Sequence, residues 1–277
     1  MKNGRASVIL YVLLLMVGAG LLLYPTLSNY YNSFHQSKSI TQYAEITKEL
    51  SEEEIEELVK DAKEYNKTLI TDNTRWKMTD EERKNYNNIL DISGTGVMGY
   101  IEIPKVNISL PIYHGTSNEV LQIAVGHVEG SSFPIGGTGT HSVLSGHRGL
   151  PSAKLFTDLD KIEEGDCFYI NILNEVLTYQ VDQILIVEPS NMDSLEIDPA
   201  QDYCTLVTCT PYGVNSHRML IRGKRIETIE EKNIIISNEA IQIEPRIVMP
   251  FILVILCIIY IIFLIFKPKR KSYASDL

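Results

Sequence analysis

Two long apolar segments without a charged residue constrain this chain more than any other feature. Residues 8–27 (VILYVLLLMVGAGLLLYPTL) and 248–266 (VMPFILVILCIIYIIFLIF) contain no Asp, Glu, Lys or Arg. A helix needs about 20 apolar residues to cross the hydrocarbon core of a bilayer. We therefore expect a transmembrane helix at 248–266 and a transmembrane helix or signal anchor at 8–27. A cleaved signal peptide is the alternative for the first segment, but no A-x-A cleavage site follows it.

The charges that flank these segments predict the topology. Lys2 and Arg5 precede the first segment, and residues 267–277 after the second are basic (KPKRKSYASDL). Lys and Arg collect on the cytoplasmic side of membrane spans. Residues 1–7 and 267–277 are therefore predicted to be cytoplasmic, and 28–247 to lie outside the cell in a two-pass topology. The net charge of the whole chain is −10, and because the two ends are basic the middle part is more acidic still, which argues against binding of nucleic acid.

Residues 28–93 are predicted to form a helical extension. Ser51 with Glu54, and Thr79 with Glu82, each have the spacing of a capping box, which opens a helix. Apolar residues at helical spacing follow the first box. The second box is expected to open a short helix that ends near residue 91. Residues 68–78, between the two helices, are predicted to be a loop, and it holds the single tryptophan of the chain.

Residues 94–226 differ from the helical pattern before them, because they are rich in runs of β-branched and aromatic residues. Gly, Pro, Asn and Asp separate these runs, as is typical of short strands joined by turns. Short helical pieces fit only at 118–125 and 153–160. Many short strands with few helices indicate a mainly β domain that closes, or nearly closes, into a barrel. Residues 227–247 are expected to link this domain back to the membrane. The predicted strands are 97–104, 107–114, 141–147, 167–173, 176–189, 203–209 and 217–226.

Of the four cysteines, Cys209 is the candidate nucleophile. Cys204 and Cys209 share one predicted strand, where five residues separate them by roughly 16 Å and put them on opposite faces, so they cannot form a disulfide. Cys209 ends the strand and precedes the turn TPYG. A strand end beside a turn combines exposure with rigid support, which a nucleophile requires. The alternative is that Cys209 is a buried apolar residue, as single cysteines frequently are. Cys167 and Cys257 are expected to be inert.

His147 and Arg218 are the candidate partners of Cys209. His147 lies between two glycines in LSGHRG, where the backbone can turn sharply. Arg218 begins the next predicted strand, so a hairpin through 210–217 would bring it beside Cys209, and a cation beside a thiol favours its nucleophilic form. His127, among glycines, is a candidate to line a cleft. No cluster of His, Cys and carboxylates has the spacing of a metal site, and no cofactor is predicted.

Three of these motifs, in this order, resemble the sortase family. TLVTC at 205–209 is similar to the segment around the sortase cysteine, LSGHRG at 144–149 to that around its histidine, and the arginine of TCTPYGVNSHR to its third conserved residue. GVMGYIEIPKVNISLPIYHGT at 96–116 resembles the opening of the sortase barrel. Three features resemble class C, the sortases that polymerise pilins. They are the sequence TPYGVNSHR, the N-terminal extension and the C-terminal apolar segment.

The resemblance implies a sortase-type closed β-barrel at 94–226 and a cysteine transpeptidase activity. Cys209 would attack the Thr–Gly peptide of an LPxTG-like sorting signal and form a thioacyl-enzyme. His147 would transfer protons, and Arg218 would position the substrate and stabilise the oxyanion. The implied partners are a pilin or surface protein that carries the sorting signal and an amine acceptor such as a pilin lysine.

Class C sortases frequently carry a lid with an Asp-Pro-aromatic motif over the active site. The candidate here is the loop 68–78, with Asp72 and Trp76 as the candidate lid residues. The loop departs from the motif because it lacks the proline, and its aromatic residue follows the aspartate by four positions instead of two. Trp76 as an ordinary packing residue is the alternative.

Other functions remain open from the sequence alone. A sortase of another class would anchor surface proteins to peptidoglycan instead of polymerising pilins. A hydrolytic cysteine protease could use the same Cys–His pair. A membrane-anchored adhesin or scaffold would use none of these residues catalytically.

Overall fold

The computed structural model describes residues 3–72 and 74–228. Most of the predicted linker 227–247, the predicted transmembrane segment 248–266 and the basic tail 267–277 lie outside the described residues. Ser28–Glu230 form one compact unit, which includes the second half of the first helix.

Helix α1 (Asn3–Glu49) contains the first apolar segment and continues beyond it without a break. It is the one helix among the described residues that is long and apolar enough to cross a membrane. Large apolar side chains such as Leu13, Leu21 and Leu22 are exposed along it. These observations support the predicted N-terminal membrane anchor, and the helix runs on without a break into the predicted helical extension.

The part of α1 after residue 27 packs on the barrel. The Tyr43 hydroxyl donates to the Met98 carbonyl at 2.8 Å and accepts from the Leu173 amide at 2.8 Å. Gln36, also buried, donates from Nε2 to the Ile123 carbonyl at 2.6 Å. Each of these groups would lack a partner without its counterpart, so this stretch of α1 is part of the folded unit.

Helices α2 (Glu52–Leu69) and α3 (Asp80–Asn88) begin at the two predicted capping boxes. Ser51 and Thr79 are the N-caps, and each exchanges hydrogen bonds with the glutamate three residues later, Glu54 and Glu82. Both boxes are therefore confirmed. The two helices bury Ala62 and Tyr86 in the main core of the barrel unit.

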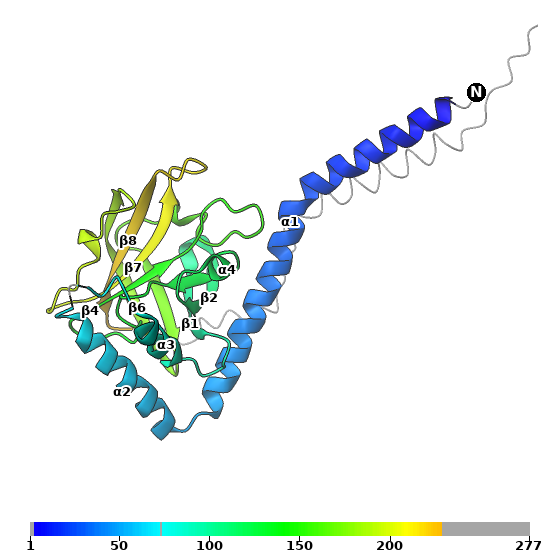
Figure 1. The fold of residues 1–277 in the computed structure, drawn as a ribbon. Helices are drawn as coiled ribbons and strands as arrows, with labels where there is room; N and C mark the ends of the chain where they lie inside the picture. The colour runs from blue at the N-terminus through cyan, green and yellow to red at the C-terminus, as the bar shows by residue number, and fades with distance from the viewer. Residues whose placement is uncertain (1–2, 73, 229–277) are drawn as a thin grey trace, which may run out of the picture. The chain divides into compact units, whose positions relative to one another are not determined.

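Eight strands close into a barrel in the order β1-β2-β3-β4-β7-β8-β6-β5 (Figure 1), which confirms the predicted fold class. The prediction missed the shortest strand, β3, and the helix expected at 118–125 is only α4 (Asn118–Leu121). In 153–160 only the start of a 3-10 turn (Leu159–Lys161) is helical. The strands are β1 (Val97–Ile103), β2 (Ile108–His114), β3 (Val125–His127), β4 (Thr140–Ser145), β5 (Cys167–Ile172), β6 (Glu175–Val187), β7 (Asp202–Thr210) and β8 (His217–Ile226).

Side chains alternate between the inside and the outside of the barrel along β7. Cys204 and Leu206 are buried in the main core. Val207 instead packs in a second apolar cluster with Val143 of β4 and Leu220 of β8. Because successive strand residues point to opposite faces, Cys209 shares the outer face with Val207. Cys204 and Cys209 are both free thiols, as predicted.

His127 is a core residue and does not line a cleft, contrary to the prediction. Its side chain is fully buried, stacks on Phe133 and lies within hydrogen-bond distance of the Tyr86 hydroxyl (2.8 Å) and the Ser132 carbonyl (2.8 Å). Burial lowers the pKa of His127 to about 3, and it lowers the pKa of His141 to about 4. The folded protein therefore keeps both imidazoles neutral.

This burial predicts a loss of stability in weak acid. The unfolded chain protonates both histidines below a pH of about 6.5, but the folded chain cannot do so until pH about 4 and 3, so stability should fall as pH falls from about 6.5. Thermal unfolding of the detergent-solubilised chain between pH 7.5 and 4.5 measures this. His127→Gln should flatten the dependence, and a melting temperature constant over this range would contradict the argument.

Candidate active site

Strand β7 lies between β4 and β8, and this arrangement brings the predicted catalytic residues together. Cys209 on β7 is the register partner of Arg218 on β8. The two strands are antiparallel and joined by the turn after Thr210, so the hairpin predicted from the sequence is confirmed. Cys209 and Arg218 are both half-buried.

His147 reaches the same place from the other side of β7. β4 pairs in parallel with β7 up to the partners Ser145 and Val207. Two hydrogen bonds extend this contact by a residue: the Gly146 amide donates to the Val207 carbonyl (3.1 Å), and the Thr208 hydroxyl donates to the Gly146 carbonyl (2.8 Å). His147, the next residue, therefore lies beside the end of β7 that carries Cys209.

Gly146 is required at this position because a side chain would not fit. A Cβ atom there would lie 2.7 Å from the ring of Phe156, which is fully buried. The Phe156 amide in turn donates to the His147 carbonyl at 3.1 Å. The chain after β4 thus folds back on itself and fixes the backbone of His147.

The charge of Arg218 acts on His147. Partial burial lowers the pKa of His147, and the positive charge of Arg218 lowers it further. Both effects disfavour the imidazolium and favour the neutral ring, which can accept a proton. The Arg218 guanidinium also donates to the carbonyls of Asn215 (3.3 Å) and His217 (3.1 Å), which holds it at the start of β8.

The turn after Cys209 contacts the loop after His147. Tyr212, which is 60% exposed, lies against Gly149, where a Cβ atom would come within 2.9 Å of the Tyr212 ring. Arg148 lies 5.8 Å over the same ring and forms an ion pair with Asp160 at 2.6 Å. No pattern in the sequence singled out Tyr212.

The loop between α2 and α3 contacts the outer face of the sheet through Trp76. Trp76 packs against the second apolar cluster, which contains Val143, Val207 and Leu220. Val207 is two residues from Cys209 on the same face of β7, a distance of roughly 7 Å along the strand. Trp76 of the loop therefore packs on the same face of the sheet that carries Cys209, and the lid stays a prediction.

Arg75, which the sequence interpretation passed over, anchors this loop. Its side chain is 3% exposed, and it donates to the carbonyls of Leu195 (3.2 Å) and Gly130 (3.4 Å) and pairs with Glu196 at 3.1 Å. Gly130 has φ +85°, and a Cβ atom there would lie 2.1 Å from the Arg75 carbonyl oxygen. The loop can sit this close only because residue 130 is glycine.

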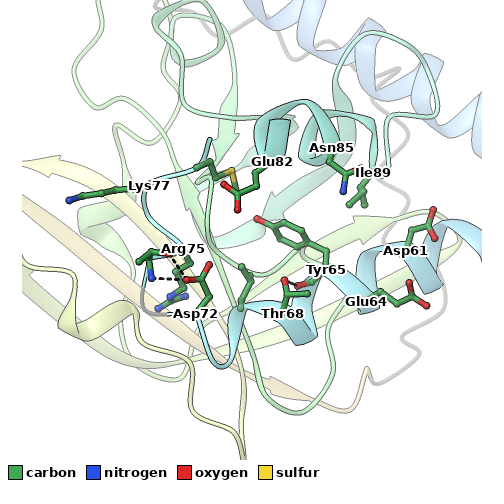
Figure 2. Close-up of a pocket in the computed structure, with 13 residues that line it drawn as sticks. Asp61, Glu64, Tyr65, Thr68, Asp72, Arg75, Lys77, Glu82, Asn85 and Ile89 are labelled. Atoms are coloured by element: carbon green, nitrogen blue, oxygen red, sulfur yellow. Dashed lines mark hydrogen bonds between the residues drawn. The ribbon is translucent and has the colours of Figure 1, made fainter. Parts of the chain in front are cut away.

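Asp72 has a local role in the structure. It accepts from the Thr74 amide and hydroxyl, both at 2.7 Å, and these bonds lower its pKa. It also lines an open pocket of about 450 Å³ between α2, α3 and the loop, with acidic side chains on its walls (Figure 2). Neither Cys209, His147 nor Arg218 is among the residues that line this pocket. Of the two candidate lid residues, Trp76 makes the contacts with the barrel.

Comparison with known proteins identifies the family. Residues 101–226 match the model of the sortase domain. The crystal structure of sortase C1 from Streptococcus agalactiae is 54% identical, with a TM-score of 0.68, and the match covers 69% of this chain and all of that one. Sortase C-1 from Streptococcus pneumoniae is 44% identical, with a TM-score of 0.63 over 69% of this chain and all of that one. Sortase D of Bacillus subtilis is 31% identical over 46% of this chain, and the match spans 63% of that relative's length.

The chain belongs to the sortase family of cysteine transpeptidases. Its solved relatives at 44–54% identity are sortases of class C, which confirms the class predicted from the motifs.

Removing the side chain of Trp76 should expose Cys209. We expect Trp76→Ala to raise the rate at which a small methanethiosulfonate reagent labels Cys209 by several-fold, because the apolar contact that holds the loop is lost. Gly130→Ala should act in the same direction by displacing the loop at Arg75. Peptide mass spectrometry separates Cys209 from the other thiols. Lys77→Ala is the matched control at an exposed loop position, and equal labelling rates in all variants would make Trp76 a packing residue only.

Replacing Arg218 with Gln should raise the pKa of His147. Loss of the nearby positive charge removes one of the two causes that disfavour the imidazolium. The pH dependence of His147 modification by diethyl pyrocarbonate, read by mass spectrometry, should therefore shift to higher pH. Arg222→Gln, which removes an arginine of β8 that is paired with Asp182, is the control and should leave the midpoint of His147 unchanged. A midpoint unmoved by Arg218→Gln would contradict the electrostatic coupling.

Proposed function

We propose that this sortase cleaves an LPxTG-like sorting signal and transfers the acyl group to an amine. The observation that carries the proposal is the register pair of Cys209 and Arg218 with His147 on the other side of β7. The Cys209 sulfur attacks the threonine carbonyl carbon, and the Thr–Gly C–N bond breaks to leave a thioacyl-enzyme. An amine then attacks the same carbon, and the C–S bond breaks to release the thiol.

His147 and Arg218 have distinct roles in this proposal. His147 takes the thiol proton of Cys209 and gives it to the departing glycine amine, and later takes a proton from the incoming amine and returns it to the Cys209 sulfur. Its lowered pKa suits the second step, because the neutral ring is the form that accepts a proton. Arg218 positions the substrate and stabilises the negative charge that develops on the carbonyl oxygen.

The amine acceptor in this proposal is a pilin lysine, so that successive transfers polymerise pilins. The support is the relation to sortases of class C. Anchoring of surface proteins to peptidoglycan is the second candidate, favoured by the relation to Sortase A of Streptococcus agalactiae, 28% identical over 73% of this chain. Both candidates share the thioacyl-enzyme and differ only in the amine.

We place the catalytic unit outside the cell, anchored at both ends. The apolar part of α1 supports the first anchor. Exposed aromatic side chains at Tyr24, Tyr30, Tyr31 and Phe34 follow or end this apolar run, as is typical of the membrane–water interface. The second anchor, at 248–266, rests on the sequence alone. Two anchors would keep the enzyme beside substrates that are themselves held in the membrane.

Mass spectrometry of the full chain in detergent with an LPxTG-type peptide tests the reaction. We expect an acyl adduct on Cys209, none in Cys209→Ala, and turnover lowered by a factor of about 10² to 10⁴ in His147→Ala. Cys204→Ala is the matched control, since that thiol is buried in the barrel, and it should keep the adduct. An adduct that persists in Cys209→Ala would refute the assignment.

The identity of the group that accepts the acyl chain distinguishes pilin polymerisation from anchoring to peptidoglycan and from hydrolysis. A lysine-bearing pilin peptide should discharge the thioacyl-enzyme faster than a peptidoglycan-type amine if the enzyme polymerises pilins. The reverse order would favour anchoring. Release of free acid with no gain from any amine would favour a hydrolase.

A further inference from the structure

The loop after His147 is held from outside the barrel by helix α1. Asn32 of α1 donates from Nδ2 to the Ser152 carbonyl at 2.9 Å, and Asn29 accepts from the Lys154 amide through Oδ1 at 2.7 Å. These bonds join residues more than a hundred positions apart in the sequence. Asn29 and Asn32 are three residues apart, so they lie on one face of the helix.

The same loop is tied to His147 by its other contacts. The Phe156 amide donates to the His147 carbonyl, and the Thr157 hydroxyl accepts from the Gly149 amide at 3.1 Å. Ser152 and Lys154 lie in the middle of the stretch that these two bonds close. α1 therefore fixes the outer part of a loop whose two ends meet at His147.

The strands support only the start of this loop, through the two hydrogen bonds between Gly146 and β7. β4 ends at Ser145, and no regular strand or helix is assigned between it and the 3-10 turn at Leu159–Lys161. A loop of this kind positions a side chain accurately only where other groups hold it. Ala153, Leu155 and Phe156 bury their side chains in the main core. The described hydrogen bonds that hold the middle of the loop from outside are those of Asn29 and Asn32 of α1.

We propose that Asn29 and Asn32 are positioning residues for His147, so that the helix that carries the N-terminal anchor also completes the active site. Asn29 and Asn32 follow closely on the apolar run that ends at Leu27. The anchor would thus do more than retain the enzyme at the membrane, because the first polar turns after it hold the histidine loop. The inference rests on the proposed role of His147 in proton transfer.

The two hydrogen bonds run in opposite directions, and this gives a sharp test. Asn29 supplies an acceptor, so Asn29→Asp keeps the bond to the Lys154 amide. Asn32 supplies a donor, so Asn32→Asp loses the bond and sets a carboxylate against the Ser152 carbonyl. The same chemical change should therefore be tolerated at one position and harmful at the other.

The experiment measures peptide turnover by the full chain in nanodiscs. We expect Asn32→Asp and Asn29→Ala each to lower kcat roughly 10-fold with little change in KM, because misplacement of His147 slows proton transfer but leaves the substrate site in place. Asn29→Asp should restore the rate lost in Asn29→Ala. Ser37→Asp, which adds the same charge on the exposed face of α1, is the control.

Hydrogen exchange of the 148–157 amides provides a readout independent of turnover. Exchange should rise in Asn32→Asp and Asn29→Ala and stay at the wild-type level in Asn29→Asp and Ser37→Asp. Equal kcat in Asn29→Asp and Asn32→Asp, or a loss in both, would overturn the positioning role. If the wild-type chain forms no thioacyl-enzyme, or His147→Ala is fully active, the proposed function fails instead, and the exchange data still decide whether α1 holds the loop.

Discussion

The central position of β7 is the constraint on which the site depends. Its antiparallel pairing with β8 places Arg218 opposite Cys209, and its parallel pairing with β4 delivers His147 to the same end. The three residues come from separate segments, yet main-chain hydrogen bonds between the strands fix the position of each residue along the strand direction. A shift of β7 by one residue would turn Cys209 into the barrel and Cys204 out of it. The packing of Cys204 in the main core therefore helps to keep the thiol of Cys209 on the outer face.

The outer face of β4, β7 and β8 also provides the surface on which the loop between α2 and α3 packs. The apolar surface of Val143, Val207 and Leu220 lies on the same face as the proposed nucleophile Cys209, and Trp76 packs on this surface. Arg75 adds a buried guanidinium with three acceptors, so the loop is held by polar contacts as well as by apolar ones. Two of these acceptors belong to Leu195 and Glu196, in the connection between β6 and β7. Opening the loop would therefore also free that connection, and the two segments are expected to move together.

Features encoded by neighbouring residues could be predicted from the sequence, and features made by distant contacts could not. The capping boxes at Ser51 and Thr79, the alternation along β7 and the hairpin that returns Arg218 to Cys209 all depend on local spacing. The three-residue strand β3 is too short to show a period. His127 was a candidate to line a cleft because glycines neighbour it, whereas Tyr86 and Phe133, which bury it, come from elsewhere in the chain. The roles of Arg75 and Gly130 exist only once the loop has docked.

The contacts of α1 change what the predicted N-terminal anchor means for this enzyme. A flexible tether would raise the local concentration of enzyme near its substrate without affecting the chemical step. Here the helix continues past the apolar run to Glu49 and is bonded to the barrel at Asn29, Asn32, Gln36 and Tyr43. Tyr43 and Gln36 bond to groups of the barrel and of the turn before β3, whereas the two asparagines bond to the histidine loop. Strain or release at the membrane end of α1 would therefore reach the histidine loop first, before it affects the packing of the barrel.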